Sequence, residues 1–162
     1  MIVFCMRCWA ENAEDSQLCV KCGAPLDADD GTYVEKLANS LMHPIPSTAM
    51  RATWVLGRRR EKSAVEPLIK AIESRSEEGV MSSAVEALGE IGDPRAIPTL
   101  TKLLEGSYLK VRLKAIEALE KIGSDDAQRQ IVKALNDPNL VIRRAAEKAL
   151  KNLGSIRGCH SD

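Results

Sequence analysis

The stretch Ala84-Val-Glu-Ala-Leu88-Gly-Glu-Ile-Gly92 decides the fold of this chain, because it recurs. It returns as Ala115-Ile-Glu-Ala-Leu119-Glu-Lys-Ile-Gly123 and as Ala146-Glu-Lys-Ala-Leu150-Lys-Asn-Leu-Gly154, each copy 31 residues after the last. An earlier and shorter copy, Ala52-Thr-Trp-Val-Leu56-Gly57, precedes the first by 32 residues. A fixed period of this length is the sequence signature of a repeat protein.

Between these blocks runs a second apolar set, in which paired residues lie four positions apart. Such a spacing places both residues of a pair on one face of a helix, so each unit is expected to be two helices. A lone helical pair cannot bury its apolar stripe, and the units must therefore stack. We predict a mostly α protein, an α-solenoid whose first helix covers residues 33–43 and whose last covers residues 139–153. The pairs are Leu68 and Ile72, Leu100 and Leu104, Ile131 and Leu135, and more weakly Leu37 and Leu41.

Glycine and proline mark the expected helix ends. Gly92, Gly123 and Gly154 close the three later copies, where a left-handed residue commonly stops a helix. Asp93-Pro94 and Asp137-Pro138 indicate turns.

Residues 33–154, with motifs such as Val111-Arg112-Leu-Lys-Ala115-Ile-Glu-Ala-Leu119, resemble HEAT repeats of the phycobilisome lyase type. The tetratricopeptide and ankyrin motifs are missing. The resemblance implies a ladder between units, made by an Asp at the turn within a unit and an Arg six residues later. We expect this ladder to be whole only at Asp137 and Arg143, with a structural role, because Arg112 faces Gly106.

Four cysteines near the start predict a metal site. Cys5-Met-Arg-Cys8 and Cys19-Val-Lys-Cys22 are two Cys-x2-Cys pairs ten residues apart, which can aim four thiolates at one ion. We expect one structural Zn²⁺, with iron as the lesser alternative. A disulfide framework or a redox pair is disfavoured, since no signal segment opens the chain and a redox motif needs no second pair.

Residues 1–26 resemble the small zinc ribbons of archaeal and bacterial proteins, on the knuckle Cys19-Val-Lys-Cys22-Gly23-Ala24-Pro25-Leu26. Gly23 fits, because the turn after the second cysteine often needs a positive φ. Trp9 stands where glycine is usual, and we expect its indole to cover the thiolates.

Charge and composition limit the remaining function classes. The 162 residues carry 23 basic and 23 acidic side chains and 3% aromatics, which describes a chain with an aliphatic core. Residues 1–30 hold two basic and six acidic side chains, so the ribbon is acidic. Residues 27–32 read as a polar linker and 155–162 as a polar tail. No stretch reaches the length of a membrane span, and without a signal segment we expect a cytoplasmic protein.

The surface suggests where a partner binds. Lys70, Lys102 and Lys133 recur at one repeat position, and Arg129 lies one turn before Lys133. If this row lines the concave face, as the second helix of each pair does in such solenoids, it can meet an acidic segment of another protein. Trp54 replaces Glu86, Glu117 and Lys148 of the other copies, so we expect it to cover the linker or ribbon, or to meet a partner.

These features favour a non-enzymatic adaptor that binds another protein. A nucleic-acid-binding module using Arg58, Arg59, Arg60, Trp9 and Trp54 is the main alternative, but the acidic ribbon and the near-neutral remainder disfavour it. A lyase-like or regulatory subunit of an enzyme complex is less favoured. Hydroxylases with HEAT-like repeats hold iron with His-Glu pairs, whereas neither His43 nor His160 is followed by Glu. Cys159 is expected to be a reduced thiol and not a metal ligand.

Overall fold

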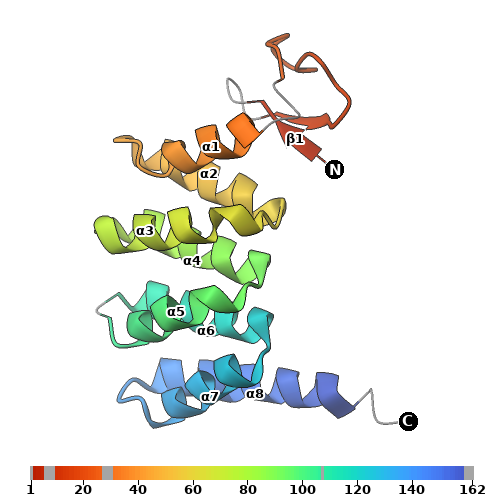
Figure 1. Cartoon of the computed structure of the whole chain (residues 1–162). Helices are drawn as coiled ribbons and strands as arrows, with labels where there is room; N and C mark the ends of the chain where they lie inside the picture. Colours follow the sequence, from red (N-terminus) through yellow and green to blue (C-terminus); the bar gives the residue numbers. More distant parts are fainter. Residues whose placement is uncertain (1, 6–9, 27–30, 107, 159–162) are drawn as a thin grey trace.

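The computed structural model describes residues 2–5, 10–26, 31–106 and 108–158. These residues form a two-stranded antiparallel hairpin followed by eight α-helices (Figure 1). The strands are β1 (Ile2–Phe4) and β2 (Glu11–Ala13), with Val3 opposite Asn12. The helices are α1 (Gly31–Ser40), α2 (Pro46–Arg58), α3 (Val65–Ser74), α4 (Glu78–Ile91), α5 (Ile97–Leu104), α6 (Leu109–Ile122), α7 (Asp125–Lys133) and α8 (Leu140–Gly158). Short 3-10 turns follow at η1 (Lys62–Ala64), η2 (Pro94–Ala96) and η3 (Ala134–Asn136).

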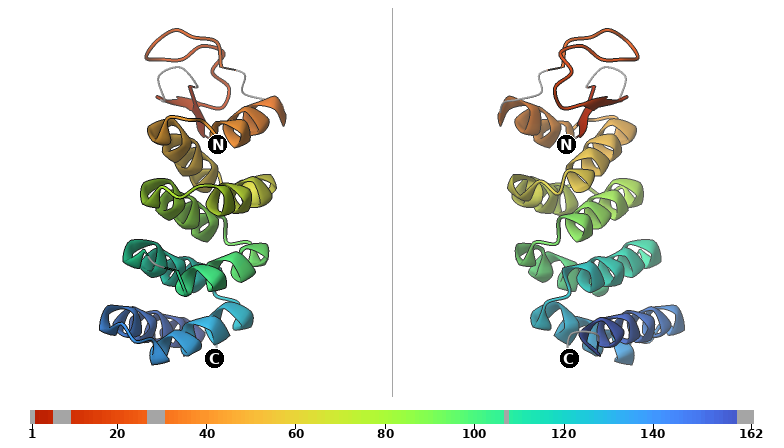
Figure 2. Two further views of the ribbon diagram at one scale, coloured as in Figure 1. Left: turned by 90° about the vertical axis from the view of Figure 1, so that its left-hand side faces the viewer. Right: turned by 90° about the vertical axis from the view of Figure 1, so that its right-hand side faces the viewer.

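The helices stack in pairs, which confirms the predicted α-solenoid. Each unit packs one helix of the row α1, α3, α5 and α7 beside one of the row α2, α4, α6 and α8 (Figure 2). The hairpin lies at the α1–α2 end of the stack (Figure 1). The two rows are called the odd row and the even row below.

The core is aliphatic and follows the repeat. Leu56, Leu88 and Leu119, from equivalent positions of the even row, are fully buried. The odd row also has fully buried residues at equivalent positions, namely Leu68, Leu100 and Ile131. All six residues belong to one continuous cluster. The periodic apolar positions of the sequence are thus the residues that join the units.

Small residues let the even row pack closely. A Cβ on Gly57 would lie 2.9 Å from the Cα of Ala87, and one on Gly89 would lie 2.8 Å from the Cα of Ala118. Both distances are too short for a side chain, so α2, α4 and α6 approach each other through bare backbone. At the next equivalent position Glu120 replaces glycine and accepts a hydrogen bond from the Asn152 amide at 2.7 Å.

Two of the three expected glycine stops are confirmed. Gly92 and Gly123 have φ of +71° and +64° and close α4 and α6. The prediction for Gly154 is wrong, because α8 continues through it to Gly158. Gly92 and Gly123 are each followed within two residues by the start of the next turn or helix, whereas the residues after Gly154 continue the same helix. The first helix also differs, beginning at Gly31 and ending at Ser40 before the turn that contains Pro44.

The last unit exposes a charged side chain at a position that the other units bury. Thr53, Val85 and Ile116 are buried at one repeat position, but in α8 this position is the exposed Glu147. Val132, Leu140 and Val141 of the same unit are large apolar side chains that are also exposed.

Candidate metal centre and binding surface

The cysteine site is built from the hairpin and the loop that follows it. Cys5 comes directly after β1, and its amide donates to the carbonyl of Ala10 at 3.0 Å. In the second knuckle the amide of Gly23 donates to the carbonyl of Cys19 at 2.9 Å, and Gly23 has the expected positive φ of +67°. The backbone is thereby wrapped around Cys19, and the Lys21 amide lies 3.4 Å from its sulfur.

Three sulfurs converge in this site. The Sγ atoms of Cys5, Cys19 and Cys22 lie within 4.8 Å of one another, and those of Cys5 and Cys22 are 3.5 Å apart. Two sulfurs bound tetrahedrally to one zinc at about 2.3 Å are separated by about 3.8 Å, so the arrangement fits a single ion. Cys5 and Cys19 are buried and Cys22 is at the surface. Cys8 and Trp9 lie outside the described residues.

Asn12 is a residue of this site that the sequence reasoning missed. Its side chain is 5% exposed, donates to the carbonyl of Ala10 at 2.7 Å and accepts from the amide of Val20 at 2.8 Å. These bonds tie β2 to the second knuckle. A lone asparagine between two cysteine pairs gives no sequence signal of this role.

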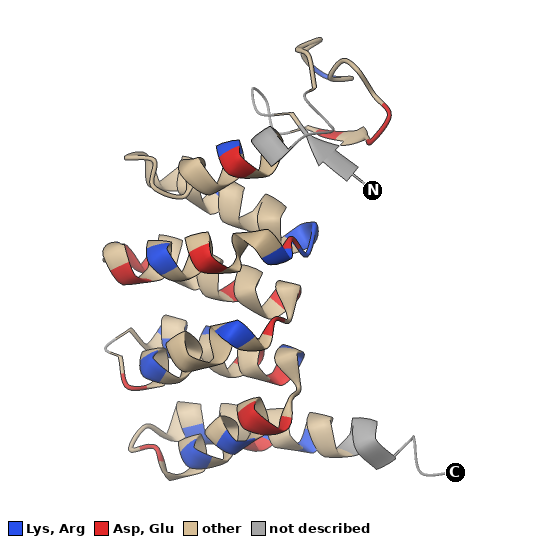
Figure 3. Cartoon of the chain, viewed as in Figure 1, with Lys and Arg blue, Asp and Glu red and all other residues tan. Residues whose placement is uncertain are grey.

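The three recurring lysines lie on the odd row. Lys70, Lys102 and Lys133 are exposed on α3, α5 and α7, where basic segments follow one another along the stack (Figure 3). The close backbone approaches at Gly57 and Gly89 are in the even row, so the lysines lie on the other row of the stack. That the lysine row lines a concave face stays a prediction. Arg129 is exposed beside them and pairs with Asp126.

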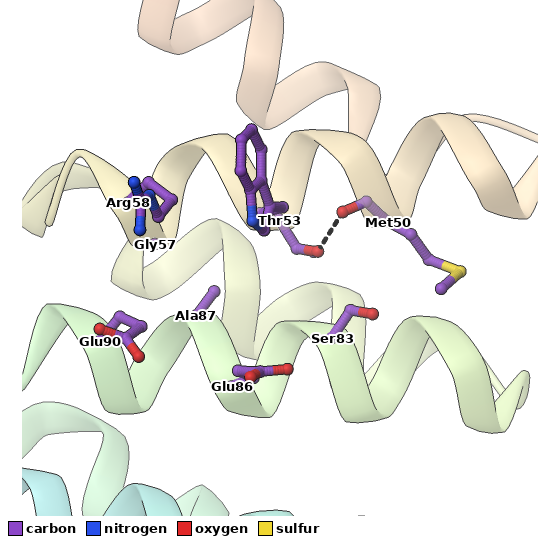
Figure 4. A pocket seen from close by; sticks show the side chains of 9 residues that line it. Met50, Thr53, Gly57, Arg58, Ser83, Glu86, Ala87 and Glu90 are labelled. Atoms are coloured by element: carbon purple, nitrogen blue, oxygen red, sulfur yellow. Dashed lines mark hydrogen bonds between the residues drawn. The ribbon is translucent and has the colours of Figure 1, made fainter. Parts of the chain in front are cut away.

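Trp54 lines a pocket of about 250 Å³ between α2 and α4. Its side chain is half exposed, in keeping with the outward-facing repeat position. Figure 4 shows Met50 and Arg58 on α2 facing Ser83, Glu86 and Glu90 on α4. The linker residues 27–30, which Trp54 was expected to cover, lie outside the described residues.

The arginine cluster after α2 is partly used inside the fold. The guanidinium carbon of Arg58 lies 5.8 Å from the Trp54 ring centroid, and that of Arg59 lies 5.3 Å from the Tyr33 ring centroid. Arg60 adopts a left-handed conformation with φ of +52° at the turn. Two of the three arginines therefore contact aromatic rings of this chain, which argues against a role for them in binding nucleic-acid phosphates.

The predicted ladder between units is wrong in its partners. Arg143 donates to the backbone carbonyls of Asp137 at 2.6 Å and Pro138 at 3.0 Å. The Asp137 carboxylate instead pairs with Arg112 of the preceding unit, which also donates to the Leu104 carbonyl at 2.6 Å. Arg112 therefore joins its own unit to the next one. His43 is a turn residue as expected, its Nδ1 accepting from the amide of Ile45 at 3.1 Å.

Comparison of sequences identifies the repeat. Residues 34–108 and 100–159 match the family of HEAT repeats. No curated protein matches the chain in sequence. Among the described residues, no helix combines the length and apolar character that crossing a bilayer requires.

Solved structures share the fold. Human deoxyhypusine hydroxylase is similar over 75% of this chain and 43% of its own, with 22% identity and a TM-score of 0.68. The complex of CpcE and CpcF of phycocyanin lyase from Nostoc sp. PCC7120 is similar over 86% of this chain and 58% of that one, with 26% identity and a TM-score of 0.66. A designed armadillo repeat protein in complex with the peptide (KR)4 is similar over 75% of this chain and 64% of its own, with 19% identity and a TM-score of 0.59.

These relatives correct one expectation. The sequence reasoning predicted a protein that is not an enzyme, but two of the similar structures come from a hydroxylase and a lyase. The fold therefore occurs in enzymes, and a lack of familiar catalytic motifs does not exclude activity. This chain spans less than two thirds of the length of each of the three solved chains.

Proposed function

The chain belongs to the HEAT-repeat family, and from that premise we propose that it is a scaffold that binds another protein through the surface of its solenoid. The observation that carries the proposal is the array itself. Stacked helical pairs repeat the same surface positions from unit to unit, so side chains of one kind form rows across several helices.

The row we assign to a partner is that of Lys70, Lys102 and Lys133. All three are exposed, and Lys133 donates to a neutral group, the Gln130 amide oxygen, at 3.1 Å. Arg129 lies one turn away, where Asp126 already pairs with its guanidinium. Such a row on successive helices complements an acidic segment of a partner protein, and surface charges of this kind mainly speed and orient encounter.

We further propose that the N-terminal ribbon holds one structural Zn²⁺. The proposal is supported by the three converging sulfurs, and the sequence supplies Cys8 as the fourth ligand. Four thiolates would leave no open coordination position, so the ion would stabilise the ribbon and not activate water. Reduced thiols suit the cytoplasm, which we propose as the location.

The scaffold proposal is tested by capturing partners from a lysate of the native organism and mapping contacts with a lysine-reactive cross-linker. We expect specific cross-links at Lys70, Lys102 or Lys133. The triple variant Lys70→Glu, Lys102→Glu, Lys133→Glu should lose most of the captured partner. A matched control, Lys110→Glu, Arg144→Glu and Lys148→Glu, changes the net charge equally on α6 and α8 and should retain it.

Two results would contradict the proposal. One is the absence of any protein captured above background. The other is a partner whose cross-links all fall on the ribbon lysine Lys21, which would move binding away from the solenoid.

A second candidate is a subunit of an enzyme complex. It is favoured by the likeness to the complex of CpcE and CpcF of phycocyanin lyase, at 26% identity. In that case the captured partner should be a stable stoichiometric subunit, and the complex should show an activity that neither part has alone. Size-exclusion chromatography with static light scattering separates this from a transient scaffold contact.

A further inference from the structure

The pocket beside Trp54 has the size of a site for one side chain. At about 250 Å³ it is smaller than the ~300–1,000 Å³ usual for drug-sized ligands and cofactors. Gly57 and Ala87 both line it, and neither has a side chain beyond Cβ that could fill the space. The pocket lies on the even row, away from the lysines of the odd row.

The walls combine an aromatic face with two carboxylates. Trp54, Met50 and Arg58 come from α2, and Glu86 and Glu90 come from α4 (Figure 4). Among the residues that line the pocket, Arg58 is the single cation. Its guanidinium carbon lies 5.8 Å from the Trp54 ring centroid, at the outer limit of a cation–π contact. The indole thus already attracts a cation of its own chain, and about half of its surface remains exposed to a partner.

The two carboxylates differ in how firmly they are held. Glu90 pairs with Lys121 of α6, and this ammonium keeps the pKa of Glu90 below its ordinary value. Glu86 lies 3.5 Å from the Nζ of Lys114, which has a nearer partner in Glu117 at 2.9 Å. A new cation at Glu86 would leave Lys114 paired. Glu86 is thus the carboxylate that can change partners at little cost.

We propose that this pocket receives an arginine side chain of the partner protein, with its guanidinium stacked on Trp54 and hydrogen-bonded to Glu86. A guanidinium suits the site better than an ammonium, because its plane matches both the ring and the carboxylate. Its aliphatic stem lies along Met50. The inference rests on the proposed scaffold function and names the side chain that the even row recognises.

The test uses the full chain with Trp9→Phe, which leaves Trp54 as its single tryptophan. The probes are the acetylated, amidated peptides Gly-Ser-Arg-Ser-Gly and its citrulline counterpart, which keeps the shape and lacks the charge. We expect the arginine peptide to change the Trp54 fluorescence in a saturable way, and the citrulline peptide to bind at least about tenfold more weakly. Isothermal titration of the unmodified chain checks that Trp9→Phe has not created the effect.

Three variants locate the contact. Glu86→Gln should weaken the arginine peptide about tenfold, since it removes a charge-assisted hydrogen bond without changing shape. Glu147→Gln, an equally exposed change on α8, should leave the affinity unchanged. Glu117→Gln should also weaken binding, because Lys114 then turns to Glu86. Thermal unfolding of each variant confirms that the fold is kept.

Equal binding of arginine and citrulline peptides, or equal affinities of Glu86→Gln and Glu147→Gln, would overturn the inference. So would a failure of both peptides to bind. If a partner is still captured through the odd row in that case, the scaffold function stands and only the arginine site falls. If no partner is captured at all, the scaffold function falls on that result.

Discussion

The ribbon and the solenoid are stabilised by different means. In the described part of the ribbon, among residues with described side chains, the buried ones are Cys5, Asn12 and Cys19. In the solenoid a continuous cluster of leucine, isoleucine, valine and alanine runs through all four units. A module of about 26 residues cannot bury enough apolar surface to fold alone, so it depends on cross-links or metal. The comparison indicates that the solenoid has an apolar core of its own, whereas the ribbon relies on the metal ion that we propose for it.

The largest expected effect is removal of the metal, which should separate the two regions. A chelator at neutral pH, or Cys22→Ser, should unfold the ribbon because structural zinc supplies ~10–16 kcal/mol to such small modules. The solenoid should keep its helices. Elemental analysis should give about one zinc per chain, and hydrogen exchange should show lost protection in residues 10–26 with unchanged protection in α2 to α8. Cys159→Ser is the control, and a protein without stoichiometric metal would refute the prediction.

The second-largest effect is expected in the even row, where close packing should make the stability of the solenoid sensitive to one added methyl group. Gly89→Ala would place a Cβ 2.8 Å from the Cα of Ala118, so α4 and α6 must move apart. We expect a loss of about 1–3 kcal/mol in the free energy of unfolding, measured with urea. Gly79→Ala is matched on the same helix, where the new Cβ meets Met50 Sδ at 3.5 Å. It should be neutral or up to about 1 kcal/mol stabilising, and equal losses in both variants would contradict the close approach.

The ionic link between the last two units should matter less than the apolar rows. Arg112 and Asp137 are 15% and 12% exposed, so Arg112→Gln leaves a largely buried carboxylate without its cation. We expect a cost of about 1–2 kcal/mol, below the ~3–5 kcal/mol of a fully buried pair. Arg95→Gln, at an arginine that is 51% exposed, should cost less than Arg112→Gln, because solvent screens its ion pair. A double variant with Asp137→Asn should cost less than the sum of its single changes, and strict additivity would rule out the link.

The smallest effect concerns pH and the turn between α4 and α5. Asp93 accepts hydrogen bonds from the side chain and the amide of Arg95, which lower its pKa from 3.8 to about 2. Because the folded-state pKa is the lower one, this carboxylate stabilises the fold above pH 4 and loses its contribution as the pH falls toward 2. We expect Asp93→Asn to cost less than about 1 kcal/mol at pH 6, and only a small part of that near pH 2. Urea unfolding of both proteins across this range measures the gap, and a gap that does not change with pH would exclude the ion pair.

Much of the fold was predictable because its signals are local and repeat. The copies around Leu88 and Leu119 predicted the paired helices, and Gly92 and Gly123 predicted where two of them end. Gly154 was wrongly expected to end the last helix, because a glycine permits a helix to stop without requiring it. The ladder at Asp137 was assigned to the wrong arginine, because a spacing of six along the chain says nothing about which cation arrives from the neighbouring unit.

The sequence by itself determined that helical pairs stack and that cysteine spacing can hold one ion, because both depend on residues a few positions apart. The tertiary structure decided which faces meet. Only packing brings Gly57 to Ala87, Arg112 to Asp137, and Trp54 beside Glu86, since these partners are 25 to 32 residues apart and the rotation between units sets their contact. That rotation is a property of the whole apolar interface, which no short stretch of the chain encodes.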